Sequence, residues 1–174
     1  MRTFKRKIDI DYENPNPEMF HVEDILWSLS FLPRYACHTP YPFSVGQHTL
    51  LGVKLLETKY QVTDKKLLRS FFCHDWSEAY LQDIPSDLKI LLPDYQEIES
   101  KFEEVIQEKF DCLNKDEHEL LERADLESRE YEITCLFNRK HEVPSWVRYN
   151  VLPTSQNLVL KRLNMSWEVL RNES

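Results

Sequence analysis

Glycine is almost missing from this chain, with 2 among 174 residues. A P-loop and a dinucleotide-binding fingerprint both need glycines where the backbone turns around a phosphate, so neither motif is available here. Few glycines also permit few tight hairpins, which leaves the 9 prolines to mark the turns. This pattern favours helices joined by proline-containing loops. The composition therefore predicts an all-α fold.

The sequence also lacks an excess of basic residues, a long apolar run and a CxxC pair. The net charge of −8 provides no basic face, so we expect no nucleic-acid partner. No apolar run approaches the roughly 20 residues of a membrane span, and the N-terminal MRTFKRKIDID lacks the apolar stretch of a signal peptide. No CxxC pair occurs among the cysteines, which are Cys37, Cys73, Cys112 and Cys135. We therefore expect a cytoplasmic protein with reduced thiols and no membrane partner.

The length and the apolar pattern indicate one domain over residues 1–174. A chain of 174 residues with 41% hydrophobic and 12% aromatic residues is long and apolar enough for one core. No linker or internal repeat divides it. About six or seven helices are predicted, with irregular stretches at 1–20 and 144–153 and a short turn at 86–91. The main helices are expected at about 22–32, 43–60, 65–82, 93–110, 115–138 and 155–171.

The pair His74-Asp75 lies inside the apolar segment LLRSFFCHDWSEAYL. An isolated buried charge costs several kcal/mol, and a metal ion would give both side chains a partner. The alternative interpretation is a buried His–Asp pair whose members satisfy each other. On a helix, Glu78 would project on the same side, four residues after His74. Asp83 follows at the predicted helix end, so the segment concentrates groups that suit a site.

Two further candidate ligands lie on other predicted helices. His48 is in the stretch SVGQHT, and Asp125 is in LLERADL, where it shares the apolar flank of its helix. Two imidazoles and two carboxylates suit a divalent transition metal such as Co, Mn, Zn or Fe better than Ca or Mg alone, although Mg remains possible.

These residues carry a resemblance to a known family. The order His48, then His74-Asp75, then Asp125 resembles the H…HD…D signature of the HD-domain phosphohydrolases. Residues 34–48, RYACHTPYPFSVGQH, look like that family's RF-x-GHT…YSVAQH stretch, and residues 74–89, HDWSEAYLQDIPSDLK, look like its HD-x-x-EAY-x-x-DIP-x-x-LK stretch. The resemblance covers roughly residues 8–135, before a C-terminal helical extension at 154–172. It is strongest to the small bacterial and phage branch with 5′-deoxynucleotidases and deoxynucleoside triphosphate triphosphohydrolases.

The chain departs from the family pattern at three places. Cys37 stands where the family usually has Gly, and Gly46 stands where it usually has Ala. The family's later acid corresponds to Glu130 or Glu132, of which Glu132 shares the helix face of Asp125. Neither Cys37 nor Gly46 occupies a predicted ligand position.

The resemblance implies a role for each site residue. The metal ligands would be His48, His74, Asp75 and Asp125. Glu78 would orient or deprotonate a metal-bound water, and Asp83 would assist proton transfer to the leaving sugar oxygen. Candidate substrate contacts are Arg34 and Lys89 for the phosphate, Tyr35 for base stacking and His38 for a phosphate or supporting contact. The alternative for each of these side chains is a solvated surface residue or, for Tyr35, a core aromatic.

The implied reaction breaks the bond between the α-phosphorus and the 5′ oxygen of a small-molecule deoxynucleotide. A monophosphate would release phosphate, and this is the substrate that we favour. A dATP-type triphosphohydrolase is the alternative, with Lys65, Lys66 and Arg69 available for the additional phosphates. Another HD phosphodiesterase, a guanosine-polyphosphate hydrolase and a non-catalytic nucleotide-binding module are further alternatives. The amphipathic helices at 94–110 and 155–171 lead us to expect a homo-oligomer.

Overall fold

A computed structural model describes residues 1–115, 118–137 and 142–172. In these ranges the regular structure is helical, and extended pairing is limited to two isolated bridges, Arg2 with Asp9 and Pro33 with Ser44. The predicted all-α class is confirmed. No helix in the described part of the chain is long and apolar enough to cross a membrane. The 3₁₀ turns are η1 (Pro17–Met19) and η2 (Tyr35–Cys37), and the α-helices are α1 (Val22–Phe31), α2 (Val45–Thr58), α3 (Lys65–Cys73), α4 (Glu78–Leu81), α5 (Ser86–Lys89), α6 (Pro93–Phe110), α7 (Glu119–Leu136), α8 (Ser145–Val151) and α9 (Gln156–Leu170).

Four predicted helices agree with the structure to within two residues at each end, namely those that correspond to α1, α2, α6 and α9. Each has a local start or stop signal that the sequence displays. Pro93 occupies the first turn of α6, and Pro33 follows the end of α1. The predicted helix at 115–138 corresponds to α7, although residues 116–117 and 138 lie outside the described residues.

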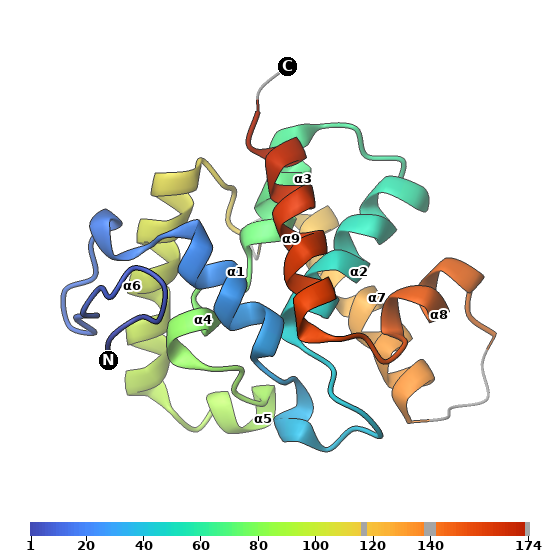
Figure 1. Ribbon diagram of the computed structural model, residues 1–174, viewed down its shortest axis with the longest axis horizontal. Helices are drawn as coiled ribbons and strands as arrows, with labels where there is room; N and C mark the ends of the chain where they lie inside the picture. Colours follow the sequence, from blue (N-terminus) through green and yellow to red (C-terminus); the bar gives the residue numbers. More distant parts are fainter. Residues whose placement is uncertain (116–117, 138–141, 173–174) are drawn as a thin grey trace.

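Helix α2 is the central element of the molecule. It begins with a capping box, in which the Ser44 hydroxyl accepts from the Gln47 backbone N–H and the Gln47 side chain accepts from the Ser44 backbone N–H. It packs against α1, α3, α7, α8 and α9 (Figure 1), so most of its side chains are buried, and His48 is fully buried. A polar imidazole in this position needs partners inside the protein.

The continuous helix predicted over 65–82 is wrong. Helix α3 ends at Cys73, a turn covers residues 74–77, and α4 begins at Glu78. In that turn the backbone N–H groups of Trp76 and Glu78 bond to the carbonyls of Cys73 and Asp75, three residues back instead of four. The chain is therefore wound more tightly where the His-Asp pair lies.

One local contact and one set of tertiary contacts hold this turn. The His74 Nδ1 atom lies 2.5 Å from the Phe71 carbonyl oxygen, which orients the imidazole. Trp76 is fully buried, and its ring is 4.8 Å from that of Phe110 and 5.1 Å from that of Trp167. Anchoring Trp76 in this aromatic cluster directs the two preceding side chains to the opposite side of the turn.

The predicted irregular stretch at 144–153 contains helix α8. Pro144 and Pro153 flank the helix rather than interrupt it, because proline is tolerated just before a helix and just after its end. Val147 and Val151 are buried in a small cluster with Leu51 of α2. Tertiary burial thus stabilises a segment too short to be helical alone.

Helix α9 packs on α1, α2 and α3 and crosses in front of α2 in Figure 1. Its close approach explains Gly46. A Cβ atom at this position would lie 2.8 Å from Leu163 Cδ1 and 3.1 Å from the Leu29 carbonyl oxygen. The absence of a Cβ atom at Gly46 therefore makes room for the C-terminal helix.

Candidate metal centre

Three ligand atoms from three helical regions converge in the core. His48 Nε2 comes from α2, His74 Nε2 from the residue that follows α3, and Asp125 Oδ1 from α7. His48 Nε2 lies 3.3 Å from His74 Nε2 and 3.1 Å from Asp125 Oδ1, and His74 Nε2 lies 3.7 Å from Asp125 Oδ1. One atom from each residue lies within 4.8 Å of the others. A single divalent ion fits such a set of nitrogen and oxygen donors.

Asp75 lies at the edge of this group. Its Oδ1 is 3.1 Å from His74 Nε2, and its Oδ2 is 3.6 Å from His48 Nε2 and 3.7 Å from the Arg34 guanidinium. The structure thus brings all four predicted ligands together, with Asp75 shared between the imidazoles and Arg34.

The opposite charges in the cluster raise the pKa of the His74 imidazole and lower the pKa values of the Asp75 and Asp125 carboxyl groups. Burial opposes protonation of His74, but the carboxylates of Asp75 and Asp125 outweigh it and raise its pKa to about 9. Burial also opposes ionisation of Asp75 and Asp125, yet the two imidazoles hold both carboxyl pKa values well below their usual range. In the absence of a metal, the carboxylates therefore retain a proton on the imidazole that a cation would displace.

Glu132 lies behind His48, on the side away from the ligand cluster. Its Oε1 is 2.6 Å from His48 Nδ1, and its Oε2 accepts from Arg34 Nε at 3.2 Å and from the Tyr35 hydroxyl at 2.7 Å. The carboxylate is fully buried. A carboxylate on the far nitrogen of a histidine fixes the ring and leaves the other nitrogen for a metal. The sequence placed Glu132 on the face of Asp125 but did not indicate this role.

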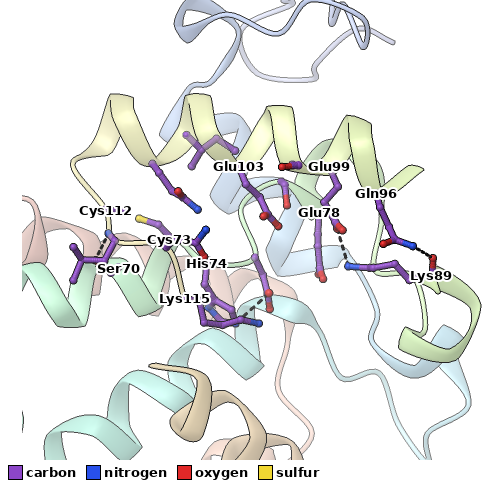
Figure 2. Close-up of a pocket in the computed structure, with 17 residues that line it drawn as sticks. Ser70, Cys73, His74, Glu78, Lys89, Gln96, Glu99, Glu103, Cys112 and Lys115 are labelled. Carbon is purple, nitrogen blue, oxygen red and sulfur yellow. Dashed lines mark hydrogen bonds and ion pairs between the residues drawn. The ribbon is translucent and has the colours of Figure 1, made fainter. Parts of the chain in front are cut away.

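Two cavities meet at the cluster. The α6 cavity has a volume of about 390 Å³, and the α5 cavity has a volume of about 210 Å³. Both are lined by Asp75, Glu78, Lys89 and Lys115. The α6 cavity, shown in Figure 2, is further lined by Ser70, Cys73, His74, Ser77, Gln96, Glu99, Ser100, Glu103, Ile106, Gln107, Cys112, Leu113 and Asn114. The α5 cavity is further lined by Arg34, Tyr35, Asp83, Ile84, Pro85, Ser86, Asp87, Asp125 and Arg129.

The two predicted catalytic acids lie beside the cluster. Glu78 is 8% exposed, and its Oε2 has no hydrogen-bond partner among the described residues. Burial, together with the charges of Asp75 and Asp83, raises its pKa well above the usual value. Burial also raises the pKa of Asp83, which lines the α5 cavity. Both carboxyl groups thus hold a proton more firmly than an exposed acid, which suits proton transfer.

Basic side chains around the cluster are held by carboxylates. Lys89 Nζ is 2.8 Å from Glu99 Oε1, and Lys115 Nζ is 2.8 Å from Asp125 Oδ2. Sequence reasoning missed Lys115, because nothing in a loop residue ten positions before Asp125 predicts their contact. Arg129, in the α5 cavity lining, was also missed, although its position four residues after Asp125 on a helix was a usable signal.

Of the two remaining predicted substrate contacts, the structure places one beside the cluster and the other away from it. Tyr35 lines the α5 cavity beside Arg34, but its hydroxyl bonds to Glu132. His38 is exposed and lines neither cavity, so the structure does not bring it to the cluster.

Comparison with known proteins adds one relative. No protein-family model matches the chain. It is similar to the uncharacterized protein YfdR of Escherichia coli strain K12, with 37% identity over 110 residues, which is 63% of this chain. The match spans 57% of that relative, less than two thirds of its length. The name of the relative states no activity, so the chemistry of this chain is argued from its site.

Proposed function

We propose that this chain is a metal-dependent phosphohydrolase of the HD type that cleaves the bond between the α-phosphorus and the 5′ oxygen of deoxynucleotides. One observation carries the proposal: two imidazoles and the carboxylate of Asp125, from separate helical regions, converge within 4.8 Å of one another beside two cavities. The donor set fits Co, Mn, Zn or Fe, with Mg possible. Glu78 and Asp83 supply proton-transfer groups beside it.

When bound, the divalent ion would lower the pKa of a water molecule and polarise a phosphoryl oxygen. Glu78 would orient or deprotonate that water through its Oε2, which no described residue hydrogen-bonds. A nearby cation favours the ionised carboxyl, so metal binding would lower the raised pKa of Glu78. Asp83 would hold a proton for the leaving sugar oxygen. Arg34 and Lys89 would neutralise charge on the phosphoryl group.

The available charge favours a monophosphate over a triphosphate. The α5 cavity is lined by four basic and five acidic side chains, so with Asp83 protonated a divalent ion would leave a net charge of about two positive units. A phosphate monoester carries about 1.5 to 2 negative charges near pH 7, and each additional phosphate adds more. Lys65, Lys66 and Arg69 line neither cavity. The latter two contact Asp111 instead.

The proposal includes a homo-oligomer. Ile90 and Leu91 are 73% and 72% exposed and directly follow Lys89, and this apolar pair is the contact between copies that we propose. Sedimentation velocity tests this part: we expect an oligomer at micromolar concentration, and a monomer would contradict it.

The activity is tested with metal-free protein reloaded separately with Mn, Co, Zn, Fe or Mg. Each form is incubated with every deoxynucleoside mono- and triphosphate, and also with cyclic nucleotides and guanosine polyphosphates, and the products are separated by chromatography. Phosphate and deoxynucleoside from monophosphates are expected. Intact triphosphate would support the triphosphohydrolase instead. Turnover only of cyclic nucleotides or guanosine polyphosphates would assign another HD activity, and binding without any turnover would leave a nucleotide-binding module. His74→Ala is the inactive control, because it removes a ligand.

A further inference from the structure

Tyr35 lies between the α5 cavity and the core of the molecule. The residue lines that cavity, and its hydroxyl donates to Glu132 Oε2 at 2.7 Å. Glu132 is fully buried, and its other oxygen, Oε1, lies 2.6 Å from His48 Nδ1. One carboxylate thus connects a tyrosine of the cavity wall to the imidazole whose Nε2 faces the other predicted ligands.

Two donors hold Glu132 Oε2, and they differ in how fully they are committed to it. Arg34 Nε lies 3.2 Å from this oxygen, while another nitrogen of the same guanidinium lies 3.7 Å from Asp75. Arg34 therefore divides its charge between two carboxylates, and it is also the side chain that we expect to contact the phosphate. The Tyr35 hydroxyl has a single proton, which it donates to Glu132. The distance of 2.7 Å is typical of a charge-assisted bond, so Tyr35 is the more firmly committed donor.

The backbone of Tyr35 also indicates that its side chain is held in place. Its φ angle is 56°, in the left-handed region that a bulky side chain rarely adopts. Such a conformation persists where the surrounding contacts enforce it, and it is frequent at functional sites. Besides the hydroxyl bond, the ring meets Phe137 edge-on at 5.6 Å and packs against the small cluster that contains Val147 and Val151. These contacts fix the hydroxyl where it reaches Glu132.

We propose that Tyr35 is a positioning residue of the candidate metal centre, which acts through Glu132 on the orientation of His48. The inference rests on the proposed function, because it requires that His48 bind a metal. The hydroxyl fixes Glu132 Oε2, so the carboxylate presents Oε1 to His48 Nδ1 in one orientation, and the imidazole keeps Nε2 directed at the ligand cluster. Hydrogen bonds to the partner of a ligating histidine tune the metal site in this way. The base-stacking role expected from the sequence needs the ring of Tyr35 instead of its hydroxyl.

Tyr35→Phe separates these roles, because it removes the hydroxyl and retains the ring. The metal-free variant is titrated with Co(II) in competition with a chelator, and no nucleotide is present. We expect the Co(II) affinity to fall by roughly tenfold, at the low end for outer partners of a ligating histidine because Arg34 still contacts Glu132. We also expect the visible absorption bands of bound Co(II) to shift, because the imidazole is reoriented.

Tyr41→Phe is the matched control, because Tyr41 packs against the same small cluster but lines neither cavity. This variant is expected to retain the Co(II) affinity and spectrum of the unmodified protein. Unchanged affinity and spectrum in Tyr35→Phe, or equal changes in the two variants, would overturn the inference.

A double-mutant cycle tests whether Tyr35 acts through Glu132. In the Glu132→Ala background, Tyr35→Phe is expected to bring no further loss of Co(II) affinity, because the acceptor is gone. Losses that add independently would overturn the inference. Co(II) binding that depends on Tyr35, in a protein that hydrolyses no nucleotide, would support the inference and contradict the proposed activity alone. Metal-dependent hydrolysis together with unchanged Co(II) affinity in Tyr35→Phe would overturn this inference alone, and no Co(II) binding by the unmodified protein would overturn both.

Discussion

Glu132 lies against the far side of the His48 imidazole, with Oε1 2.6 Å from Nδ1, and both side chains are fully buried. The opposite nitrogen of the ring faces His74 and Asp125. Glu132 thus lies in contact with a predicted ligand without being one. Because Asp125 and Glu132 are two turns apart on α7, one helix supplies a group on each side of His48.

The first prediction concerns this pair. Glu132→Ala removes the acceptor that orients His48, and we expect metal affinity to fall by roughly 10- to 100-fold, as is typical for partners of ligating histidines. Competition with a chelator for Mn or Zn measures it. Glu130→Ala is the matched control, because Glu130 is an exposed acid of the same helix. A similar loss in both variants would contradict a positioning role for Glu132.

Asp75 provides a second prediction. Asp75→Ala removes a carboxylate that contacts both imidazoles, so we expect metal binding and hydrolysis to be lost while the helical circular dichroism spectrum is retained. Asp94→Ala, at an exposed acid of α6 outside both cavities, should retain both properties. Hydrolysis of nucleotides by Asp75→Ala at the rate of the unmodified protein would show that the site is wrongly assigned.

The third prediction is a pH dependence of the metal-free protein. The pKa of His74 is raised from 6.5 to about 9 in the folded state, so its contribution to stability is present below pH 6.5 and is lost as the pH rises through 9. The free energy of unfolding is expected to fall by about 3 kcal/mol over this pH range. Urea unfolding at a series of pH values measures it. With metal bound, the His74 imidazole carries no extra proton to lose. We therefore expect the stability of the metal-bound form not to decline as the pH rises through 9. A decline of the same size in both forms would exclude His74 as its source.

Backbone strain at η2 gives a fourth prediction. Tyr35, Ala36 and Cys37 all have left-handed φ values, of 56°, 47° and 63°. This region costs roughly 1–2 kcal/mol for a residue with a Cβ atom. Cys37 is exposed, so Cys37→Gly loses little packing and is expected to raise the free energy of unfolding by about 1 kcal/mol. Cys37→Ala keeps the Cβ atom and should bring no gain. Equal stabilities of the two variants would contradict strain at this residue.

Gly46 supplies the fifth prediction. Alanine has the better helix propensity, yet its Cβ would crowd Leu163 and the Leu29 carbonyl, so we expect Gly46→Ala to destabilise the protein by about 1–3 kcal/mol. Thermal unfolding measures the loss. The double variant Gly46→Ala, Leu163→Ala should be more stable than the sum of the single changes predicts. Strict additivity would show that contact with α9 is not the cause.

Local signals in the chain determined the fold class and pointed to the candidate residues of the site. Few glycines, proline-marked turns and helical spacing of apolar residues predicted the helices that became α1, α2, α6 and α9. These signals lie within a few residues of the structure they specify. The apolar surroundings of His74-Asp75, His48 and Asp125 marked them as candidates, since a buried imidazole or carboxylate needs a partner. It was the resemblance to the HD-domain phosphohydrolases that made the four residues a predicted ligand set.

Only the tertiary structure decided the helix break at 74–77, the position of Glu132 behind His48 and the contact between Lys115 and Asp125. It also decided that acids of α6 line one cavity and that Arg34 and Arg129 line the other. Each of these features depends on how segments distant in the chain pack against one another. The buried Trp76 overrides the local preference for a continuous helix, and the charge of each cavity is set by which helices meet there.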